Sequence, residues 1–191
     1  MLEVADLPVP EPGPKEVRVR LKAAALNHLD VWVRKGVASP KLPLPHVLGA
    51  DGSGVVDAVG PGVEGFAPGD EVVINPGLSC GRCERCLAGE DNLCPRYQIL
   101  GEHRHGTYAE YVVLPEANLA PKPKSLSFEE AAAIPLTFLT AWQMVVDKLG
   151  VRPGDDVLVM AAGSGVSVAA IQIAKLFGAR VIATAGSEDK L

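Results

Sequence analysis

The stretch DVLVMAAGSGVSVAAIQIAKLFGARVIATA, residues 156–185, decides the fold of the second half of the chain. It opens with an apolar run over 156–161, which is typical of a strand buried on both faces. A glycine-containing turn, a helix over 169–177 closed by Gly178, and a second strand over 180–185 follow. Strand, turn, helix and strand form one βαβ unit, the opening of a doubly wound parallel sheet.

The segment before this unit carries the signals of two helices. Ser127-Phe-Glu-Glu130 is a capping box, in which the serine hydroxyl accepts the Glu130 amide and the glutamate reaches back. Pro135 interrupts the helix that starts there. Helical spacing resumes over 137–149, and Gly150 stands where the end of a helix favours glycine.

The first half of the chain alternates short β-branched runs with glycine-rich turns. Residues 16–23 alternate apolar and charged side chains, as expected of a half-buried strand. Similar short runs at 52–60, 70–74 and 108–114 predict a compact, largely antiparallel β domain. The Pro-rich residues 121–125 end this pattern.

These patterns divide the chain into two domains of different class. We expect residues 1–125 to form the β-rich domain, and residues 126–191 to contain the linking helices and the first βαβ unit of a second domain. The fold class is therefore α+β followed by α/β. Because a mononucleotide-binding half has three strands and only two are present, the second domain is expected to be incomplete.

Composition argues against several partners and locations. With 191 residues, 48% hydrophobic and 21% charged, the chain has the composition of a globular protein. Eighteen Lys and Arg against 23 Asp and Glu give a net charge of -5, which argues against a nucleic-acid partner. No apolar run approaches the roughly 20 residues of a membrane span, and the acidic, Pro-rich start lacks a signal-peptide pattern. We therefore expect a cytoplasmic protein with no membrane partner.

All four cysteines, Cys80, Cys83, Cys86 and Cys94, lie within residues 79–95. In a reducing cytoplasm, clustered thiols more often hold a metal than form disulfides. Four thiolates on one loop match the closed tetrahedral coordination of a structural zinc, which leaves no position for a substrate. The spacing therefore predicts one structural zinc per chain.

Two other interpretations of these cysteines stay open. An iron–sulfur cluster shares the Cys-x2-Cys-x2-Cys start, but ferredoxin spacing places three residues before the fourth cysteine, where this chain has seven. A redox-active disulfide would account for only two of the four thiols.

A cofactor-binding turn is predicted inside the βαβ unit. Gly163, Ser164, Gly165 and Val166 follow the first strand and open the helix, so backbone amides and the positive helix end can face a pyrophosphate. The third glycine of the usual pattern is missing. A plain tight turn between strand and helix therefore stays an alternative.

The end of the second strand bears on the choice of cofactor. An Asp or Glu about 20 residues after the glycine turn binds the ribose 2′-hydroxyl of NAD, but Ala185-Gly186-Ser187 stands in that place. Without the carboxylate a 2′-phosphate is not repelled, and Ser187 and Lys190 are expected to bind it. NADP(H) is therefore favoured over NAD(H). The alternative is that Lys190 is only solvated and that the acid lies further along the chain.

Together these features resemble the medium-chain dehydrogenase/reductase superfamily, which includes zinc alcohol dehydrogenases and quinone oxidoreductases. The resemblance covers essentially the whole chain and implies a GroES-like domain followed by the start of a Rossmann domain, truncated at both ends. Besides the cysteine lobe and the βαβ unit, it rests on Asn27-His-Leu-Asp30, residues 49–60 (GADGSGVVDAVG), Gly69-Asp70-Glu-Val, Gly106-Thr-Tyr-Ala-Glu-Tyr111 and Leu139-Thr-Ala-Trp142.

The active site is where the chain departs from the family pattern. In zinc alcohol dehydrogenases the catalytic ligands occupy positions that match Asn27, Ala50 and approximately Leu136, and the usual ligand types are absent here. The resemblance therefore implies a quinone-oxidoreductase-like site without catalytic zinc. It also implies that Asn27 lines the substrate side of the nicotinamide, Asp30 orders that segment and Thr140 touches the nicotinamide. Asn27 is our candidate for polarising the substrate oxygen. The alternative is that Asn27 and Asp30 only satisfy local backbone groups.

Histidines are the remaining candidate metal ligands. His28 is expected to face away from Asn27 if its segment is extended. His103 and His105 share a polar loop, and a solvated pair is favoured over a ligand pair. A metal held by His28 and His103 stays open.

We therefore expect an oxidoreductase that transfers a hydride between NADP(H) and a small carbonyl, quinone or alcohol substrate. Activity is expected of a homo-oligomeric full-length parent, with the fragment itself inactive. One alternative is an alcohol dehydrogenase with catalytic zinc on unusual ligands. Another is a non-catalytic, zinc-stabilised interaction module.

Overall fold

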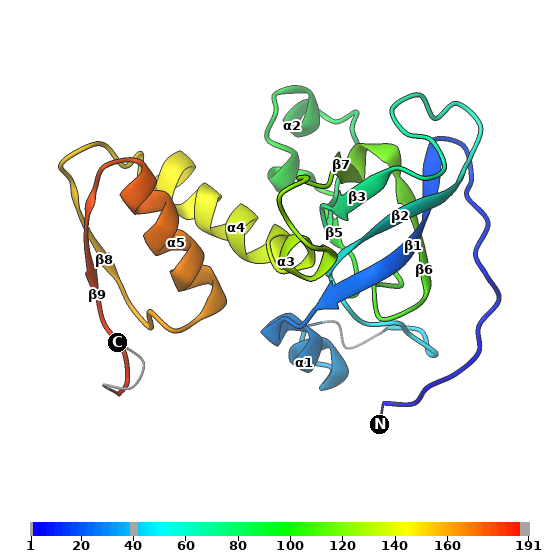
Figure 1. The fold of residues 1–191 in the computed structure, drawn as a ribbon, viewed down its shortest axis with the longest axis horizontal. Coiled ribbons are helices and arrows are strands. Elements are labelled where there is room, and N and C mark those ends of the chain that lie inside the picture. Colours follow the sequence, from blue (N-terminus) through cyan, green and yellow to red (C-terminus); the bar gives the residue numbers. More distant parts are fainter. Residues whose placement is uncertain (1, 39–41, 188–191) are drawn as a thin grey trace. The chain divides into compact units, whose positions relative to one another are not determined.

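The computed structural model describes residues 2–38 and 42–187 (Figure 1). The chain divides into two compact units, Met1–Pro135 and Leu136–Leu191. Within the described ranges, no helix has both the length and the apolar character that crossing a membrane requires.

A five-stranded antiparallel sheet forms the centre of the first unit (Figure 1). Its strands are arranged in the order β6-β1-β2-β3-β7, and every neighbouring pair is antiparallel. The observed β domain confirms the strands expected from the sequence. Their bounds are β1 (Glu16–Ala25), β2 (Asp51–Val59), β3 (Glu71–Ile74), β6 (Tyr111–Pro115) and β7 (Leu119–Pro121).

The core of this unit is built on the alternation along the strands. In β1, Val17 and Val19 are fully buried, whereas Arg20 is exposed on the opposite side. Removing this apolar surface from water is the main stabilising contribution to the unit. The buried cluster consists of Val17, Val19, Val56, Val72, Ile74, Leu78, Leu100, Val112 and Leu114.

Short elements extend from the sheet. The helix α1 (His28–Arg34) begins where β1 ends. A small antiparallel pair, β4 (Gly77–Leu78) and β5 (Gln98–Ile99), joins the two ends of the cysteine lobe. The lobe contains only α2 (Glu84–Leu87) and the 3-10 turn η1 (Asp91–Leu93), and a further 3-10 turn, η2 (Glu116–Asn118), connects β6 to β7.

The predicted capping box begins α3 (Phe128–Ala132). The Glu130 N–H donates to the Ser127 hydroxyl at 3.2 Å, and the Ser127 N–H donates to Glu130 Oε2 at 2.8 Å. The helix packs against β1 and β2, and the Ser53 hydroxyl donates to the Phe128 carbonyl at 2.6 Å. Because of this packing α3 belongs to the first unit, and the division falls after Pro135, later than the boundary expected at residue 125.

The second unit begins with a helix that changes pitch. The helix α4 (Pro135–Trp142) continues as a π-helix, η3 (Gln143–Lys148), which the spacing of apolar residues did not indicate. Pro135 stands at the first helical position, where its missing N–H costs nothing. Gly150 follows the helix with a φ of 61°, the left-handed conformation that favours glycine.

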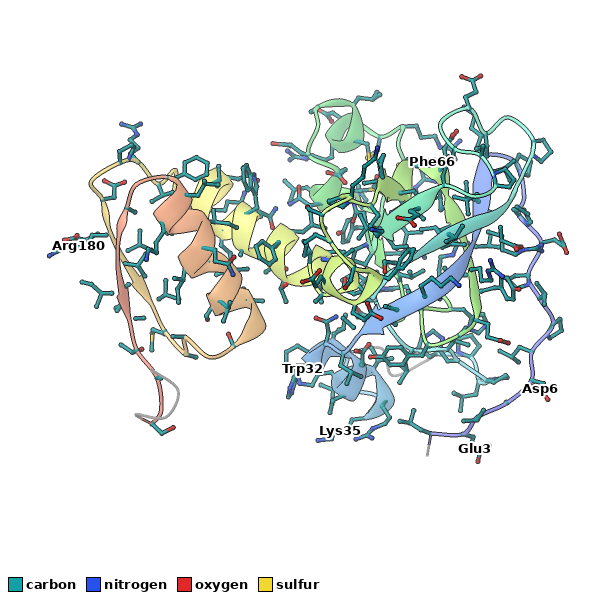
Figure 2. The ribbon with its side chains drawn as sticks, viewed as in Figure 1. Glu3, Asp6, Trp32, Lys35, Phe66 and Arg180 are labelled. Atoms are coloured by element: carbon teal, nitrogen blue, oxygen red, sulfur yellow. The ribbon has the colours of Figure 1, made fainter. Side chains whose placement is uncertain are left out.

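The βαβ unit is confirmed. The strands β8 (Asp156–Val159) and β9 (Arg180–Ala183) are parallel, and α5 (Gly165–Leu176) connects them and packs against both. Asp156 lies opposite Arg180, whose guanidinium donates twice to the carboxylate, each time at 2.6 Å. Figure 2 shows Arg180 projecting from β9.

The expectation that the first strand of this unit is buried on both faces is wrong for the described chain. Leu158 in β8 is 62% exposed and Ile182 in β9 is 48% exposed. Within the described residues β8 pairs only with β9, and α5 packs on this pair. The apolar run therefore marks the strand correctly, but two strands and one helix cannot cover both of its faces.

Candidate active site and metal centre

The candidate catalytic residues lie where β1 ends and α1 begins. Asn27 is the N-cap of α1, with φ −123° and ψ 151°, and asparagine is among the residues preferred there. The segment is helical from His28 on, so the expected alternation along a strand does not determine where His28 points. The His28 ring packs edge-on against Trp32, with ring centroids 4.9 Å apart. Figure 2 labels Trp32 on α1.

Asp30 organises the turn around Asn27. It is buried, with 7% of its surface exposed, and occupies the third position of α1. Its Oδ2 accepts the Asn27 N–H at 2.7 Å, and its Oδ1 accepts the Gly49 N–H at 3.2 Å. The carboxylate therefore ties the start of α1 to the segment that leads into β2.

A second buried carboxylate meets the side chain of Asn27. Asp51 opens β2 and is 1% exposed, and its Oδ2 accepts the Asn27 Nδ2–H at 2.9 Å. Asn27 thus donates to Asp30 through its main chain and to Asp51 through its side chain. Asp30 also binds Gly49, which lies two residues before Asp51 in the chain. The hydrogen bonds therefore form a closed ring through Asn27, Asp30, Gly49 and Asp51, and this ring fixes the orientation of the Asn27 amide.

Tyr108 joins this network, although no pattern in the sequence indicates a role for it. Its hydroxyl donates to Asp30 Oδ2 at 2.7 Å, and its N–H donates to the Leu48 carbonyl at 2.9 Å. Burial, followed by the hydrogen bond to the Asp30 carboxylate, raises the pKa of the Tyr108 phenol. The surrounding motif was part of the family resemblance, but a hydroxyl that reaches a carboxylate 78 residues away leaves no spacing signal.

His103 and His105 are exposed, as expected, but they take part in the fold. The Nδ1 of His103 accepts the Ile99 N–H, and the Nδ1 of His105 accepts the Val47 N–H, both at 3.1 Å. Among the described residues, the four cysteines form the only cluster of three or more side chains that could bind a metal ion. A metal on His28 and His103 therefore has no geometric support.

The four cysteines converge as predicted. Their Sγ atoms all lie within 4.8 Å of one another, with 3.4 Å between Cys83 and Cys86 and 3.9 Å between Cys80 and Cys86. Tetrahedral zinc with Zn–S bonds of about 2.3 Å separates its sulfurs by about 3.8 Å. All four thiols are free of disulfides. The donor set therefore fits a structural zinc.

Backbone donors surround the sulfurs of the lobe but do not act on all of them equally: despite the Cys86 backbone N–H, burial and the neighbouring sulfurs raise the pKa of Cys83 to about 11. The Cys94 sulfur accepts the backbone N–H of Cys80 at 3.5 Å and that of Arg96 at 3.3 Å. The Arg82 backbone amide, helped by the Arg96 guanidinium, lowers the pKa of Cys80 to about 5. Backbone donors to metal-bound sulfurs are the usual second layer of such sites.

The glycine turn of the second unit presents an open helix N-terminus. Ser164 is the N-cap of α5, and its hydroxyl accepts the Ser167 N–H at 3.3 Å. Gly163, Ser164 and Gly165 are exposed, and Ala161 just before them adopts a φ of 52°. A Cβ on Gly165 would lie 3.0 Å from a Thr137 methyl group, so glycine allows α5 to start close to α4. Free amides at the start of a helix are suited to an anion such as a pyrophosphate.

Thr140, Ser187 and Lys190 are the other residues predicted to bind the cofactor. The Thr140 hydroxyl donates to the Leu136 carbonyl at 2.7 Å, one turn back in α4. Ser187 is exposed beyond the end of β9. Lys190 lies outside the described residues. The structure thus brings Gly163–Val166 together in one turn of the second unit, and Asn27 with Asp30 in the first.

A β domain with its own four-thiol lobe, followed in the chain by a parallel βαβ unit, defines the class of medium-chain dehydrogenases and reductases. The model of the alcohol dehydrogenase GroES-like domain matches residues 13–124. A zinc-type alcohol dehydrogenase-like protein of Schizosaccharomyces pombe is 41% identical over 94% of this chain and 50% of its own length. The chain therefore belongs to the alcohol dehydrogenase family with a GroES-like domain.

Solved structures agree with this assignment. The crystal structure of an NAD-dependent alcohol dehydrogenase is 99% identical, with a TM-score of 0.97, over 99% of this chain and 55% of that one. A cobalt- and zinc-bound thermostable alcohol dehydrogenase of Pyrobaculum aerophilum is 37% identical, with a TM-score of 0.92, over 98% of this chain and 56% of that one. The chain spans about half the length of the curated relatives it matches.

Proposed function

We propose that the complete enzyme is an oxidoreductase that transfers a hydride between a nicotinamide cofactor and a small carbonyl, quinone or alcohol substrate. The observation that carries the proposal is Asn27, whose amide is fixed by two buried carboxylates at the position where the family places a catalytic ligand. When bound, the cofactor supplies or accepts the hydride. The chain must hold the substrate and stabilise negative charge on its oxygen.

Asn27 is suited to that task. An amide nitrogen carries two hydrogens, and one of them donates to Asp51. In this proposal the second hydrogen donates to the substrate oxygen. Because Asp51 holds the amide in place before the substrate arrives, little reorganisation is needed when charge develops. Asp30 holds Asn27 in place by accepting its main-chain N–H.

The cysteine lobe takes a structural role in this proposal. Cys80, Cys83, Cys86 and Cys94 would hold one zinc ion with all four positions filled, so the ion stabilises the lobe and does not meet the substrate. The thiols fit the ion by number, spacing and surrounding N–H donors. A closed thiolate site cannot polarise a carbonyl group.

The choice between NAD(H) and NADP(H) is a separate question. The lack of an acid over 185–187 supports NADP(H), but the 99% identical protein is named an NAD-dependent enzyme, so the comparisons give the NADP(H) preference no support. We therefore propose NAD(H). Titration of the complete enzyme with NADH and NADPH tests this choice. Tighter binding of NADPH would restore the preference expected from the sequence.

Replacing Asn27 tests the function. Asn27→Ser keeps a residue favoured at a helix N-cap but removes the amide that faces Asp51. We expect kcat/KM for the best alcohol, carbonyl or quinone substrate to fall by about a hundredfold, the usual effect of losing one oxyanion donor. Asn92→Ser, an exposed asparagine of the lobe, is the matched control. Unchanged turnover in Asn27→Ser would remove the basis of the proposal.

A zinc-dependent alcohol dehydrogenase with unusual ligands is the second candidate, favoured by the cobalt- and zinc-bound relative. Elemental analysis of the complete enzyme distinguishes the two. One zinc per chain agrees with the cysteine lobe as its holder, whereas two would require a second site. A complete enzyme that binds no nicotinamide nucleotide would instead point to a zinc-stabilised interaction module.

Assembly and location complete the proposal. We expect the complete enzyme to be a homo-oligomer in the cytoplasm, and residues 1–191 alone to show no turnover, because a nucleotide site needs more than one βαβ unit. Gel filtration and an activity assay of both forms test these expectations. Turnover by residues 1–191 would refute the second.

A further inference from the structure

Tyr108 is the residue of the candidate site that has no assigned role. Its hydroxyl lies 2.7 Å from Asp30 Oδ2, the same oxygen that accepts the Asn27 N–H at 2.7 Å. Asp30 Oδ1 meanwhile accepts the Gly49 N–H. One carboxylate oxygen thus connects the phenol of Tyr108 to the main chain of Asn27.

The main chain of Tyr108 is fixed by hydrogen bonds to residues 48 and 49, while the residue as a whole is 36% exposed. The Tyr108 and Thr107 amides donate to the Leu48 and Gly49 carbonyls, each at 2.9 Å. The ring lies so close to Gly49 that a Cβ there would be 2.5 Å from a ring carbon. A side chain at residue 49 would overlap the ring, so glycine there allows the phenol to approach Asp30.

Thr107, the residue before Tyr108, contacts Asp51, the second acidic residue of the site. The Thr107 hydroxyl, which is buried, donates to the main-chain carbonyl of Asp51 at 2.8 Å. Residues 107 and 108 therefore contact both of the residues that hold Asn27, one through its backbone and one through its side chain. A shift of residues 107 and 108 would therefore displace both Asp30 and Asp51, the two hydrogen-bond partners of Asn27.

We propose that Tyr108 is a positioning residue for Asn27, acting through the hydrogen bond of its hydroxyl to Asp30. This inference rests on the proposed function. The hydroxyl holds Asp30 Oδ2 in the place where it accepts the Asn27 N–H, and the N-cap conformation then directs the side-chain amide. Without the Tyr108 hydroxyl, Asp30 Oδ2 accepts only the Asn27 N–H, and the turn at the start of α1 becomes less rigid. The electrostatic stabilisation that Asn27 offers depends on its being fixed in advance.

The test is a double-mutant cycle on the complete enzyme. Tyr108→Phe removes only the hydroxyl and keeps the ring on Gly49. We expect kcat to fall about tenfold, while the dissociation constant of the nicotinamide cofactor stays unchanged. In the Asn27→Ser background the same change should cost less than twofold, because residues that act through one another are not additive. Tyr111→Phe is the matched control, since the Tyr111 ring faces the Arg18 guanidinium at 5.7 Å, outside this network.

Each outcome decides one claim. A tenfold loss in Tyr108→Phe that recurs undiminished in the Asn27→Ser background would overturn the positioning role. So would a lowered melting temperature with kcat unchanged, which is the signature of a purely structural hydroxyl. If Asn27→Ser keeps full activity, the proposed function fails, and the positioning role with it. If Asn27→Ser is impaired and Tyr108→Phe is not, only the positioning role fails.

Discussion

Removing the zinc proposed for the cysteine lobe should unfold the lobe and leave the sheet intact. Among residues 80–94 only Cys94 is a buried apolar side chain, and neither α2 nor η1 contains a buried residue. Six backbone hydrogen bonds close within this segment. The lobe therefore has no hydrophobic core of its own, whereas the sheet has the cluster around Val17 and Ile74.

The magnitude follows from the same features. Ordering the fifteen residues from 80 to 94 costs about 15–20 kcal/mol at slightly over 1 kcal/mol each. Six hydrogen bonds at about 1 kcal/mol each offset about 6 kcal/mol of this cost. The remaining deficit of about 9–14 kcal/mol is of the same size as the roughly 10–16 kcal/mol that a structural zinc contributes.

The assay is hydrogen exchange on the complete enzyme before and after treatment with a strong chelator, with zinc followed by elemental analysis. We expect amides of residues 83–94 to lose protection, while those of β1 and β2 keep theirs. Returning one equivalent of zinc should restore the lobe. Protection that survives complete loss of zinc would refute the reasoning, because the lobe would then be stable by itself.

Three further changes should be read out by unfolding experiments. Gly106→Ala should destabilise the first unit by about 1–3 kcal/mol or more, because its Cβ would fall on the Gly49 carbonyl oxygen; a neutral effect in urea titration would show that the loop yields easily. Ser127→Ala should cost about 1 kcal/mol by removing the α3 cap, with Ser127→Asp as the control that retains it. The N–H groups of Gly65 and Glu64 lower the pKa of Glu116 below its ordinary 4.5, so its stabilising contribution is present above that pH and lost as pH falls through the lowered pKa. Glu116→Gln should therefore flatten the acid side of the stability profile, and an unchanged acid limb would contradict this.

Local signals predicted most of the secondary structure. The alternation over 16–23, the capping box at Ser127 and the apolar runs of the βαβ unit each depend on neighbouring residues, and each is confirmed. The cysteine spacing succeeded for the same reason, since four ligands on one short loop have few other ways to converge. Where a feature depends on the number of neighbouring strands, as the burial of Leu158 does, the local pattern was not sufficient.

The candidate site shows where sequence reasoning ends. Asn27 and Asp30 were predicted from the family resemblance of one short motif, and the helix N-cap explains why they lie three residues apart. Tyr108 was missed because it lies 78 residues from Asp30. The connection arises only when β1, β2 and the segment before β6 come together. Hydrogen bonds between distant segments are set by tertiary packing, and no local period reveals them.

The Tyr108–Asp30 contact also predicts how the first unit behaves in alkali. Burial and the hydrogen bond to Asp30 raise the pKa of the phenol above its ordinary 10. A group whose pKa is raised by folding stabilises the fold fully below its unfolded value, and that stabilisation is lost as pH rises through the folded value. Tyr108 should therefore keep its proton, and its hold on Asp30, throughout the neutral and mildly alkaline range.

This expectation is tested by urea unfolding of the wild type and of Tyr108→Phe between pH 8 and the alkaline limit of the fold. The wild type should be the more stable protein below pH 10, and the difference should shrink only above it. A difference that already disappears near pH 8 would mean that the phenol ionises early, and the hydroxyl could not then donate a hydrogen bond to Asp30 in mildly alkaline solution.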